Sequence, residues 1–260
     1  MTAAPAEFVR LAHQLADAAG AVQRRYFRTP VAVDTKADES PVTIADRESE
    51  AAMRELIGRH CPSHGILGEE HGADSLDAEW VWVLDPIDGT KSFITGRPLF
   101  GTLIALLHNG VPVVGIIDQA IIGERWVGVA GAPSTHNGKP IRVRSCARID
   151  DAVLFVTSPR MFSTEAQLTA FQRVERAVRL PMFGGDCYAY GLMAMGFADL
   201  VVEASLAPYD YMALVPVVLG AGGMLTDWQG QALTMQSDGR VIAAGDPRVH
   251  AAAKALLDLA

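Results

Sequence analysis

From about residue 150 the hydrophobic pattern of this chain changes to alternating strands and helices, and this change restricts the folds that the sequence can adopt. Before it, strand-like segments follow one another closely, and Asn109-Gly110 is typical of a tight turn between two of them. After it, strands and helices alternate, which implies a sheet covered by helices. We therefore expect a layered α/β protein with an antiparallel-rich half, residues 1–145, and an α/β half, residues 146–260. The strand-like segments of the first half are 80–88, 101–110, 111–120 and 124–130.

Helical patterns open the chain and recur in its second half. Residues 5–28 have apolar side chains at helical spacing, and Thr43 is a suitable cap for a second helix with Asp46 in its first turn. The polar stretch between these helices, residues 31–43, is typical of an exposed loop or a short hairpin. The sequence shows no long linker, so the boundary between the halves is expected to be tight. In the second half we expect strands at 152–157, 178–183, 199–203 and 241–244 and helices at 163–176, 187–195, 211–220 and 246–259.

Composition and charge argue against several classes of protein. Half of the 260 residues are hydrophobic and a fifth are charged, which is typical of a globular chain and not of a disordered one. The formal charge of -8 argues against sequence-independent nucleic-acid binding and against binding to anionic membranes. No apolar run is long enough to cross a bilayer, and the N-terminal segment lacks the pattern of a signal peptide. The three cysteines and seven histidines show no zinc-site spacing, and we expect a reduced, cytoplasmic protein.

The segment Trp80–Phe93, WVWVLDPIDGTKSF, carries the strongest chemical signal. A buried strand runs into Asp85 and Asp88, so two carboxylates can converge on one point outside the sheet. Hard divalent cations such as Mg²⁺ prefer oxygen ligands of this kind. Gly89 and Thr90 then offer backbone N–H groups where a helix begins, which suits phosphate oxygens. The alternative is that Asp88-Gly89 forms a simple turn and that Asp85 caps a helix.

Further carboxylates at strand ends or helix starts bear on this choice. Glu69 and Glu70 follow the short apolar run GILG, where a strand is expected to stop. Asp46 lies in the first turn of its helix, and Asp210 directly precedes an apolar helix. Each of them alone would be interpreted as a cap or a surface charge. Together with the pair at the end of the buried strand, they match what a two-metal phosphoryl-transfer site requires.

The same residues resemble those of a known family. Residues 85–93, DPIDGTKSF, closely resemble the first signature of the inositol monophosphatase family. This resemblance implies an αβαβα sandwich of the inositol monophosphatase and fructose-bisphosphatase type. In the second signature, Tyr209 stands where the family usually has Trp, so the packing around Asp210 is expected to differ. The resemblance also covers, in the family's order, Lys36, Thr43 to Asp46, Gly68 to Glu70, Gly196 to Glu203 and Asp210.

The resemblance implies a role for each of these positions. Asp46, Thr90 and Glu69 are the implied catalytic residues, with Asp46 and Thr90 orienting the attacking water. The backbone at Gly89 and Thr90 is expected to hold the phosphate, and Glu70 to make a water-mediated metal contact. The implied cofactor is Mg²⁺, two or three ions in each site, with Asp46 helping to hold the third. The implied ligands of the first two ions are Glu69, Asp85, the carbonyl of Ile87, Asp88 and Asp210.

The implied substrate is a small-molecule phosphate ester. Asp186 lies where typical inositol monophosphatases have a small residue, and a carboxylate there suits a cationic group. Glu203 lies seven residues before Asp210, where the inositol enzymes also place a carboxylate against the substrate. The surrounding sequence GGDCY resembles the histidinol-phosphate phosphatases of the same superfamily. Because histidinol phosphate carries an ammonium and an imidazole that both carboxylates could pair with, we expect L-histidinol phosphate, in histidine biosynthesis, as the substrate.

Alternatives stay open at this point. Asp186 directly precedes an apolar helix and could cap it. Inositol 1-phosphate, or a promiscuous range of monophosphates, is the main alternative substrate, followed by sulfated nucleotides or fructose bisphosphates. A family member that binds metal without catalysis would lack a metal carboxylate or Thr90, and none of these is missing here. The resemblance also implies a homodimer.

Overall fold

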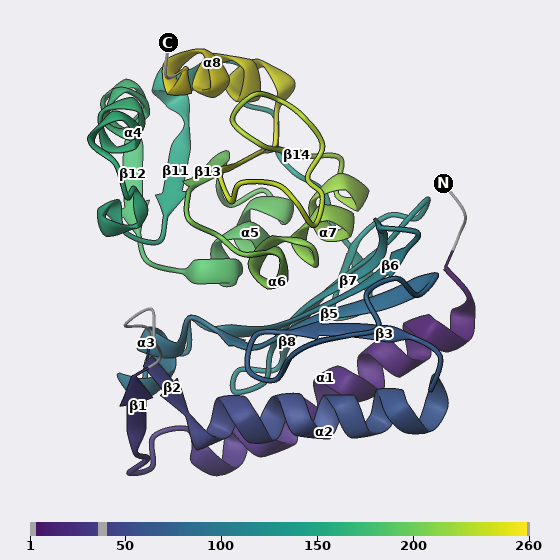
Figure 1. Ribbon diagram of the computed structural model, residues 1–260. Helices are drawn as coiled ribbons and strands as arrows, with labels where there is room; N and C mark the ends of the chain where they lie inside the picture. Colours follow the sequence, from purple (N-terminus) through teal and green to yellow (C-terminus); the bar gives the residue numbers. More distant parts are fainter. Residues whose placement is uncertain (1–3, 36–40, 259–260) are drawn as a thin grey trace.

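The computed structural model describes residues 4–35 and 41–258 and shows helices and sheets in alternating layers (Figure 1). Two helices cover an eight-stranded sheet, three helices separate it from a five-stranded sheet, and two further helices cover the far face of that second sheet. Three hydrophobic clusters fill the spaces between the layers. The αβαβα sandwich that the family resemblance implies is therefore confirmed.

The first layer consists of α1 (Ala6–Tyr26) and α2 (Ile44–His60), which pack side by side on one face of the larger sheet (Figure 1). α1 is amphipathic and buries its apolar stripe against this sheet. α2 begins where the sequence predicts, because Thr43 is its cap and its hydroxyl accepts a hydrogen bond from the N–H of Ala45 at 3.1 Å.

The polar stretch before α2 forms a short hairpin, one of its two predicted forms. β1 (Val33–Thr35) pairs antiparallel with β2 (Pro41–Thr43), which leads directly into α2. Lys36, which the family resemblance includes, lies outside the described residues.

The larger sheet is formed by the first half of the chain and is antiparallel-rich, as predicted. β3 and β5 run parallel, whereas every other neighbouring pair described in this sheet is antiparallel. The sequence does not predict β4, β9 and β10, because strands of two or three residues are too short to show an alternating pattern. In sheet order the strands are β10 (Lys139–Pro140), β9 (Thr135–His136), β8 (Glu124–Val129), β7 (Val111–Gln119), β6 (Gly101–His108), β5 (Trp80–Asp88), β3 (Gly65–Gly68) and β4 (Gly72–Asp74).

Three helices lie between the two sheets (Figure 1). The prediction of one helix over residues 211–220 is wrong, because the chain forms two helices separated by Met212 and Ala213. Pro216 explains the break: it has no N–H to bond the carbonyl of Met212, and its ring clashes with the carbonyl four residues earlier in a continuous helix. The helices of this layer are α5 (Asp186–Ala194), α6 (Pro208–Tyr211) and α7 (Leu214–Gly220).

The smaller sheet belongs to the second half of the chain and is mixed. β11 runs parallel to β12 and β13, whereas β15 runs antiparallel to β13 and β14. Its outer face is covered by α4 (Glu165–Ala177) and α8 (Pro247–Leu257), both close to their predicted positions. The short strand β14 is not predicted. In sheet order the strands are β12 (Leu180–Phe183), β11 (Val153–Val156), β13 (Leu200–Glu203), β15 (Val241–Ala244) and β14 (Met224–Thr226).

The two sheets fall on either side of the predicted boundary near residue 145. The middle helices belong to the second half of the chain, yet α5 and α7 contact strands of both sheets. Residues of both halves therefore meet in the space between the sheets, close to the short helix α3 (Thr90–Ile94) that follows β5. That the halves are separate units stays a prediction.

Candidate metal and phosphate site

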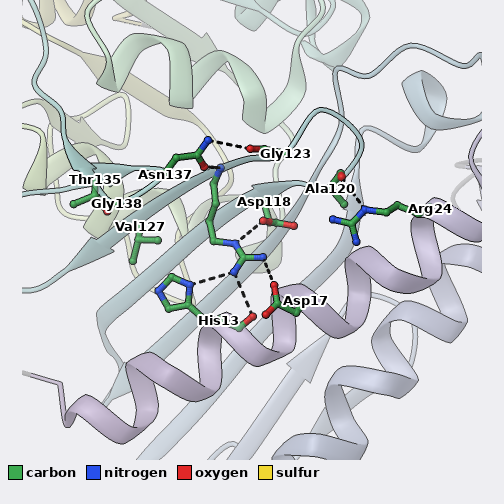
Figure 2. Close-up of a pocket in the computed structure, with 11 residues that line it drawn as sticks. His13, Asp17, Arg24, Asp118, Ala120, Gly123, Val127, Thr135, Asn137 and Gly138 are labelled. Atoms are coloured by element: carbon green, nitrogen blue, oxygen red, sulfur yellow. Dashed lines mark hydrogen bonds and ion pairs between the residues drawn. The ribbon is translucent and has the colours of Figure 1, made fainter.

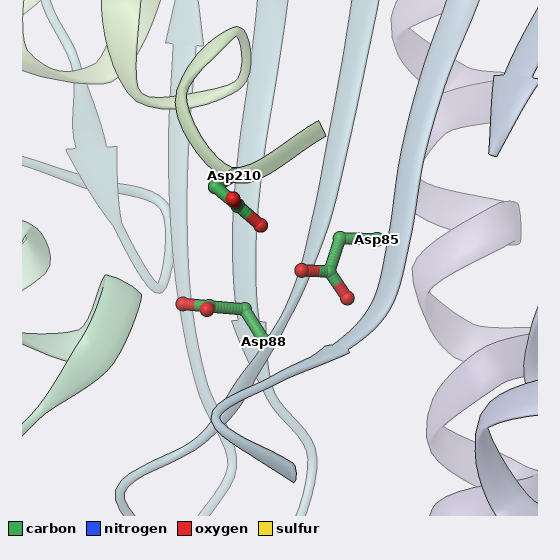
Figure 3. A group of neighbouring side chains, drawn as sticks. All are labelled: Asp85, Asp88 and Asp210. Carbon is green, nitrogen blue, oxygen red and sulfur yellow. The ribbon is translucent and has the colours of Figure 1, made fainter. Parts of the chain in front are cut away.

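Two of the predicted carboxylates lie at the end of β5. Residues three positions apart in a regular strand point to opposite faces of the sheet. Here the pairing with β6 shifts between Asp85, opposite Leu103, and Asp88, opposite Gly101, so β5 holds one extra residue and its alternation is reset. One carboxylate oxygen from each aspartate and one from Asp210 all lie within 4.8 Å of one another (Figure 3). The structure thus brings these three carboxylates together.

Asp210 comes from α6, in the layer between the sheets. Its Oδ2 accepts a hydrogen bond from the N–H of Ala207 at 2.6 Å, which fixes the carboxylate at the start of the helix. Tyr209, where the family usually has Trp, is half-buried and packs against the core between the sheets. Tyr211, which follows Asp210, is buried, and its hydroxyl donates to the carbonyl of Thr234 at 2.8 Å. Two tyrosines therefore pack on either side of Asp210 in the chain.

Burial and mutual repulsion disfavour the ionised form of the three aspartates. Burial raises the pKa of Asp85 well above its ordinary value, and the neighbouring carboxylates raise it further. Burial likewise raises the pKa of Asp88 well above its ordinary value, and it raises the pKa of Asp210 to about 7. A bound cation would relieve this repulsion, and three carboxylate oxygens are a donor set that suits a hard divalent cation such as Mg²⁺. The residues present therefore fit the metal that the family resemblance implies.

Glu69 and Glu70 follow β3 on a turn beside this group. The charge of Glu69 helps to raise the pKa of Asp85 and that of Asp210, so its carboxylate lies near both. Its backbone N–H donates to the carbonyl of Leu84 at 3.1 Å, which places the turn next to the end of β5. The structure thus brings Glu69 to the region of the three aspartates.

This turn is held in place by Glu50, a residue that the sequence analysis does not identify. Glu50 lies on α2 and is fully buried, and its carboxylate accepts hydrogen bonds from the N–H of Glu70 at 2.7 Å and of His71 at 3.1 Å. Gly68 leaves the necessary space, because a Cβ there would lie 1.9 Å from Glu50 Oε1. The sequence does contain a signal for Glu50, because this residue lies one helical turn after Asp46 on the same face of α2.

Asp46 and Thr90, predicted to act together, are joined by a hydrogen bond. The hydroxyl of Thr90 lies 3.3 Å from Asp46 Oδ1 and 3.2 Å from the carbonyl oxygen of Ile87, and it can donate to either. The other carboxylate oxygen of Asp46 accepts from the N–H and the hydroxyl of Thr43, at 2.8 and 2.6 Å. Burial raises the pKa of Asp46. Gly89 precedes α3 with a φ of 89°, a left-handed conformation that favours glycine.

Asp186 opens α5 without capping it. The cap residue is Gly185, and no side-chain hydrogen bond caps the helix, so the alternative interpretation of Asp186 as a cap is wrong. The carboxylate lies instead over the start of α3, because a Cβ built on Gly89 would lie 2.9 Å from Asp186 Oδ2. The hydroxyl of Ser92 lies 3.5 Å from the same oxygen, a long contact. Burial raises the pKa of Asp186 to about 6.

The first turn of α5 contacts the loop that carries the aspartates. The N–H of Cys187 donates a hydrogen bond to Asp88 Oδ2. The Cys187 thiol is buried against β6, where a Cβ built on Gly101 would lie 2.7 Å from its sulfur, and burial raises the thiol pKa well above its ordinary value. A neutral thiol in this position packs between α5 and the sheet.

Glu203 ends β13 and is buried among hydrogen-bond donors. Its Oε1 accepts from the N–H of Thr157 at 3.1 Å and from the hydroxyl of the same residue, and its Oε2 accepts from the hydroxyl of Tyr190 at 2.9 Å. Burial raises the pKa of Glu203 to about 7. Its charge also helps to raise the pKa of Asp88 and that of Asp210, so it belongs to the same acidic region. The sequence analysis does not identify these two donors, which come from distant segments.

A separate pocket of about 400 Å³ lies between α1 and the β7–β9 side of the larger sheet (Figure 2). None of the predicted site residues lines it. Arg125 lines this pocket and donates to Asp118 Oδ1 at 2.5 Å and to Asp17 Oδ1 at 2.7 Å. The charge of Arg125 is thus paired within the protein.

This chain is similar in sequence to known phosphatases. The model of the inositol monophosphatase family matches residues 4–258. The chloroplastic bifunctional phosphatase IMPL2 of Arabidopsis thaliana is 50% identical over 252 residues, which cover 94% of this chain and 72% of that protein. The histidinol-phosphatase of Mycobacterium tuberculosis is 37% identical over 228 residues, which cover 85% of this chain and 88% of that protein.

Solved structures agree with these sequence matches. An inositol monophosphatase from Zymomonas mobilis has a TM-score of 0.89 at 49% identity, covering 96% of this chain and 97% of that one. Within residues 4–35 and 41–258, no helix is both long and apolar enough to span a membrane. With a family match over nearly its whole length and relatives of this similarity, the chain belongs to the inositol monophosphatase family.

Proposed function

We propose that this protein is a Mg²⁺-dependent phosphomonoesterase that hydrolyses L-histidinol phosphate to L-histidinol and inorganic phosphate. The observation that carries the proposal is the convergence of Asp85, Asp88 and Asp210, which offers oxygen donors to a hard cation beside the start of a helix. The family membership supports phosphate-ester hydrolysis at such a site. The similarity to a histidinol-phosphatase at 37% identity supports the choice of substrate.

The proposed metal site has ligands from three segments of the chain. Mg²⁺, when bound, lowers the pKa of water, neutralises the phosphate charge and stabilises the departing alkoxide. Two ions are proposed, with a weaker third beside Asp46. The backbone N–H groups of Gly89 and Thr90 are proposed to bind the phosphate. Glu70 is proposed to contact the metal through a water molecule. The proposed ligands are Glu69, Asp85, the carbonyl of Ile87, Asp88 and Asp210.

The pair Asp46 and Thr90 is proposed to orient the attacking water. Asp46 Oδ2 is occupied by two donors of Thr43, which leaves Oδ1 to accept the hydroxyl proton of Thr90. When Thr90 donates to Asp46, a lone pair of its hydroxyl oxygen is free to accept a hydrogen bond from the water. This places the water relative to the phosphate before reaction, which is the kind of positioning that raises turnover.

Asp186 is the stronger candidate for recognising a cation on the leaving alcohol. Glu203 already accepts hydrogen bonds on both carboxylate oxygens from Thr157 and Tyr190. Within the described residues, Asp186 accepts a hydrogen bond only from Ser92, at 3.5 Å, so its carboxylate retains most of its capacity to accept further bonds. An ammonium or imidazolium beside Asp186 would therefore gain a charge-assisted hydrogen bond.

Inositol 1-phosphate is the second candidate substrate. It is supported by the similarity to the inositol monophosphatase from Zymomonas mobilis at 49% identity, and by a probable inositol 1-monophosphatase of Mycobacterium tuberculosis that is 34% identical over 254 residues. A promiscuous monophosphatase would accept both esters. A non-catalytic family member is disfavoured, because every proposed metal carboxylate and Thr90 are present.

A cytoplasmic homodimer is also part of the proposal. The dimer rests on the family resemblance, and the compartment is supported by the three cysteines, which are all free and buried. Sedimentation equilibrium of the purified protein tests the dimer. A measured mass of 27.8 kDa, that of a single chain, would contradict it.

The substrate is tested by phosphate release from a panel of esters with saturating Mg²⁺. The panel contains histidinol phosphate, inositol 1-phosphate, fructose 1,6-bisphosphate and adenosine 3′,5′-bisphosphate. We expect the highest kcat/KM for histidinol phosphate. The variant Asp88→Asn, purified in the same way, controls for contaminating phosphatases. Equal or higher kcat/KM for inositol 1-phosphate would contradict the substrate assignment and leave the phosphatase assignment standing.

A further inference from the structure

We propose that Gln23 is a positioning residue for the metal site and acts through the main-chain carbonyl of Pro86. The proposal rests on the proposed function, because it concerns the loop that carries the proposed ligands. Gln23 lies near the end of α1, on the opposite face of the larger sheet from α5 to α7. Its side chain is fully buried, at 0% exposure, which is unusual for a glutamine and calls for hydrogen-bond partners.

The amide nitrogen of Gln23 forms a closed set of hydrogen bonds with Pro86 and Thr102, whereas its Oε1 is buried and has no hydrogen-bond partner among the described residues. Its Nε2 donates to the carbonyl of Pro86 at 2.8 Å and to Thr102 Oγ1 at 2.6 Å. The hydroxyl of Thr102 in turn donates to the same carbonyl at 3.0 Å. Both amide hydrogens and the hydroxyl hydrogen are thus used. Since a carbonyl can only accept, the nitrogen of Gln23 and not its oxygen must face Pro86.

The β-bulge at the end of β5 explains why this carbonyl needs side-chain donors. The pairing with β6 is lost between Asp85 and Asp88, and Thr102 stands opposite this interruption. Pro86 lies in the bulge, so its carbonyl has no regular partner from the strand ladder. A buried carbonyl without a donor is costly, and a peptide that can rotate would relieve the cost by changing the loop. Gln23 and Thr102 remove that possibility.

The same peptide group controls Asp85. The carbonyl of Pro86 and the N–H of Ile87 belong to one planar trans peptide and point in opposite directions. With the carbonyl held toward α1 and Thr102, the N–H is aimed at Asp85, and it donates to Asp85 Oδ1 at 2.9 Å. Gln23 therefore fixes the orientation of the Asp85 carboxylate through one peptide plane, without itself approaching the three aspartates.

The test is the affinity of metal-free protein for Mn²⁺, measured by calorimetry after removal of metal with EDTA. Gln23→Leu removes both donors at similar volume, and we expect Mn²⁺ to bind about 10- to 100-fold more weakly, the usual effect of losing a group that orients a metal ligand. Thr102→Val should weaken Mn²⁺ binding in the same direction, and Thr102→Ser, which keeps the hydroxyl, should bind Mn²⁺ like the wild type. In turnover assays kcat should fall for Gln23→Leu while KM changes little.

Leu11→Ala is the matched control for damage to α1. Leu11 is buried in the core beneath α1, well before Gln23 along the helix, so the control should lower the melting temperature and leave Mn²⁺ affinity unchanged. Wild-type Mn²⁺ affinity in Gln23→Leu, with a lowered melting temperature, would overturn the proposal and make Gln23 a packing residue. Should Gln23→Leu not fold, Thr102→Val against Thr102→Ser decides the question by the same readout. If the wild type binds Mn²⁺ but hydrolyses none of the esters, the proposed function fails, and the Gln23 comparison is still decided by metal binding.

Discussion

The N–H of Cys187 donates a hydrogen bond to the carboxylate of Asp88, a residue 99 positions earlier in the chain. This bond joins the first turn of α5, in the second half of the chain, to the end of β5 in the first half. The partial positive charge at a helix N-terminus favours a carboxylate at this point. Asp88 is therefore bound by α5, while one of its carboxylate oxygens lies within 4.8 Å of an oxygen from each of Asp85 and Asp210. Figure 3 shows the three side chains.

Replacing Asp88 by asparagine separates its hydrogen bond with Cys187 from its proposed role as a metal ligand. The amide oxygen of Asp88→Asn can still accept from Cys187, so the fold should be kept, but a charged metal ligand is lost. We expect turnover to fall by roughly 100-fold or more, as for the loss of a group that stabilises transition-state charge. Circular dichroism serves as the control for folding. Turnover near the wild-type value at saturating Mg²⁺, for this variant or for Asp85→Asn, would show that the metal site lies elsewhere.

The crowding of carboxylates predicts a pH-dependent stability in metal-free protein. The pKa of Asp210 is about 7 in the folded protein, whereas the ordinary value of 3.8 applies to the unfolded chain. The folded state therefore binds the proton more tightly. Its contribution to stability is complete below about pH 4 and is lost as the pH rises toward 7. With EDTA present, the melting temperature of Asp210→Asn should rise relative to that of the wild type as the pH increases from about 4 to about 7.

This comparison also removes the contribution of three histidines, of which His13 and His64 are partly buried and His250 is buried. The pKa values of His13, His64 and His250 are lowered by burial, so these groups make folding more favourable as the pH rises. Both proteins carry them, and their effects cancel in the difference. Added Mg²⁺ should shrink or reverse the gap, since the cation neutralises the repulsion. If the difference in melting temperature between the two proteins stays constant from pH 4 to pH 7, the raised pKa of Asp210 in the folded protein is contradicted.

Thr90→Ala tests the proposed orientation of water. If the hydroxyl acts in the transition state, kcat should fall by about 10²- to 10⁴-fold, with a smaller change in KM. Thr90→Ser keeps the hydroxyl next to Asp46 Oδ1 and is expected to retain most activity. Steady-state kinetics of both variants decide the point. A change confined to KM would make Thr90 a phosphate-binding residue only.

Asp186→Asn tests the identity of the leaving group. A charged hydrogen bond contributes roughly 1.5–3 kcal/mol against about 1 for a neutral one, so KM for histidinol phosphate should rise several-fold or more. p-Nitrophenyl phosphate carries no cation and should be affected little. Asparagine tolerates the left-handed φ of 46° at this position, and Asp186 does not cap α5, so the melting temperature should hardly change. Equal losses on both esters would disfavour the pairing and make inositol 1-phosphate as good a candidate.

Features that depend on neighbouring residues in the chain could be predicted from the sequence. The strand at 80–88 has its predicted bounds, Thr43 caps α2, and the four first-half strands and most helices lie within a few residues of their predicted positions. These features follow from alternation, helical spacing and capping chemistry, which are local. The DPIDG sequence likewise places two carboxylates at a strand end, and the bulge that unites them lies within that segment.

Residues that support the site from other layers could not be predicted. Gln23 donates to the carbonyl of Pro86 and Tyr190 donates to Glu203, and no local pattern links either residue to its partner. The apolar pattern continues through Met212 and therefore predicts one helix, whereas Pro216 acts on the backbone four residues earlier and separates α6 from α7. Tertiary contacts decide the positions of Gln23 and Tyr190, whereas the break before α7 is a local effect of Pro216.

Phosphate release by metal-stripped protein tests the central claim most directly. After EDTA treatment and removal of the chelator, histidinol phosphate or any other ester that the untreated protein hydrolyses should yield no phosphate. Activity should return with Mg²⁺ or Mn²⁺, whereas Ca²⁺, which accepts a looser geometry, should inhibit. Asp88→Asn, assayed in parallel, should stay inactive under all conditions. Full activity of the stripped wild-type protein, without added metal, would contradict a metal-dependent site at Asp85, Asp88 and Asp210.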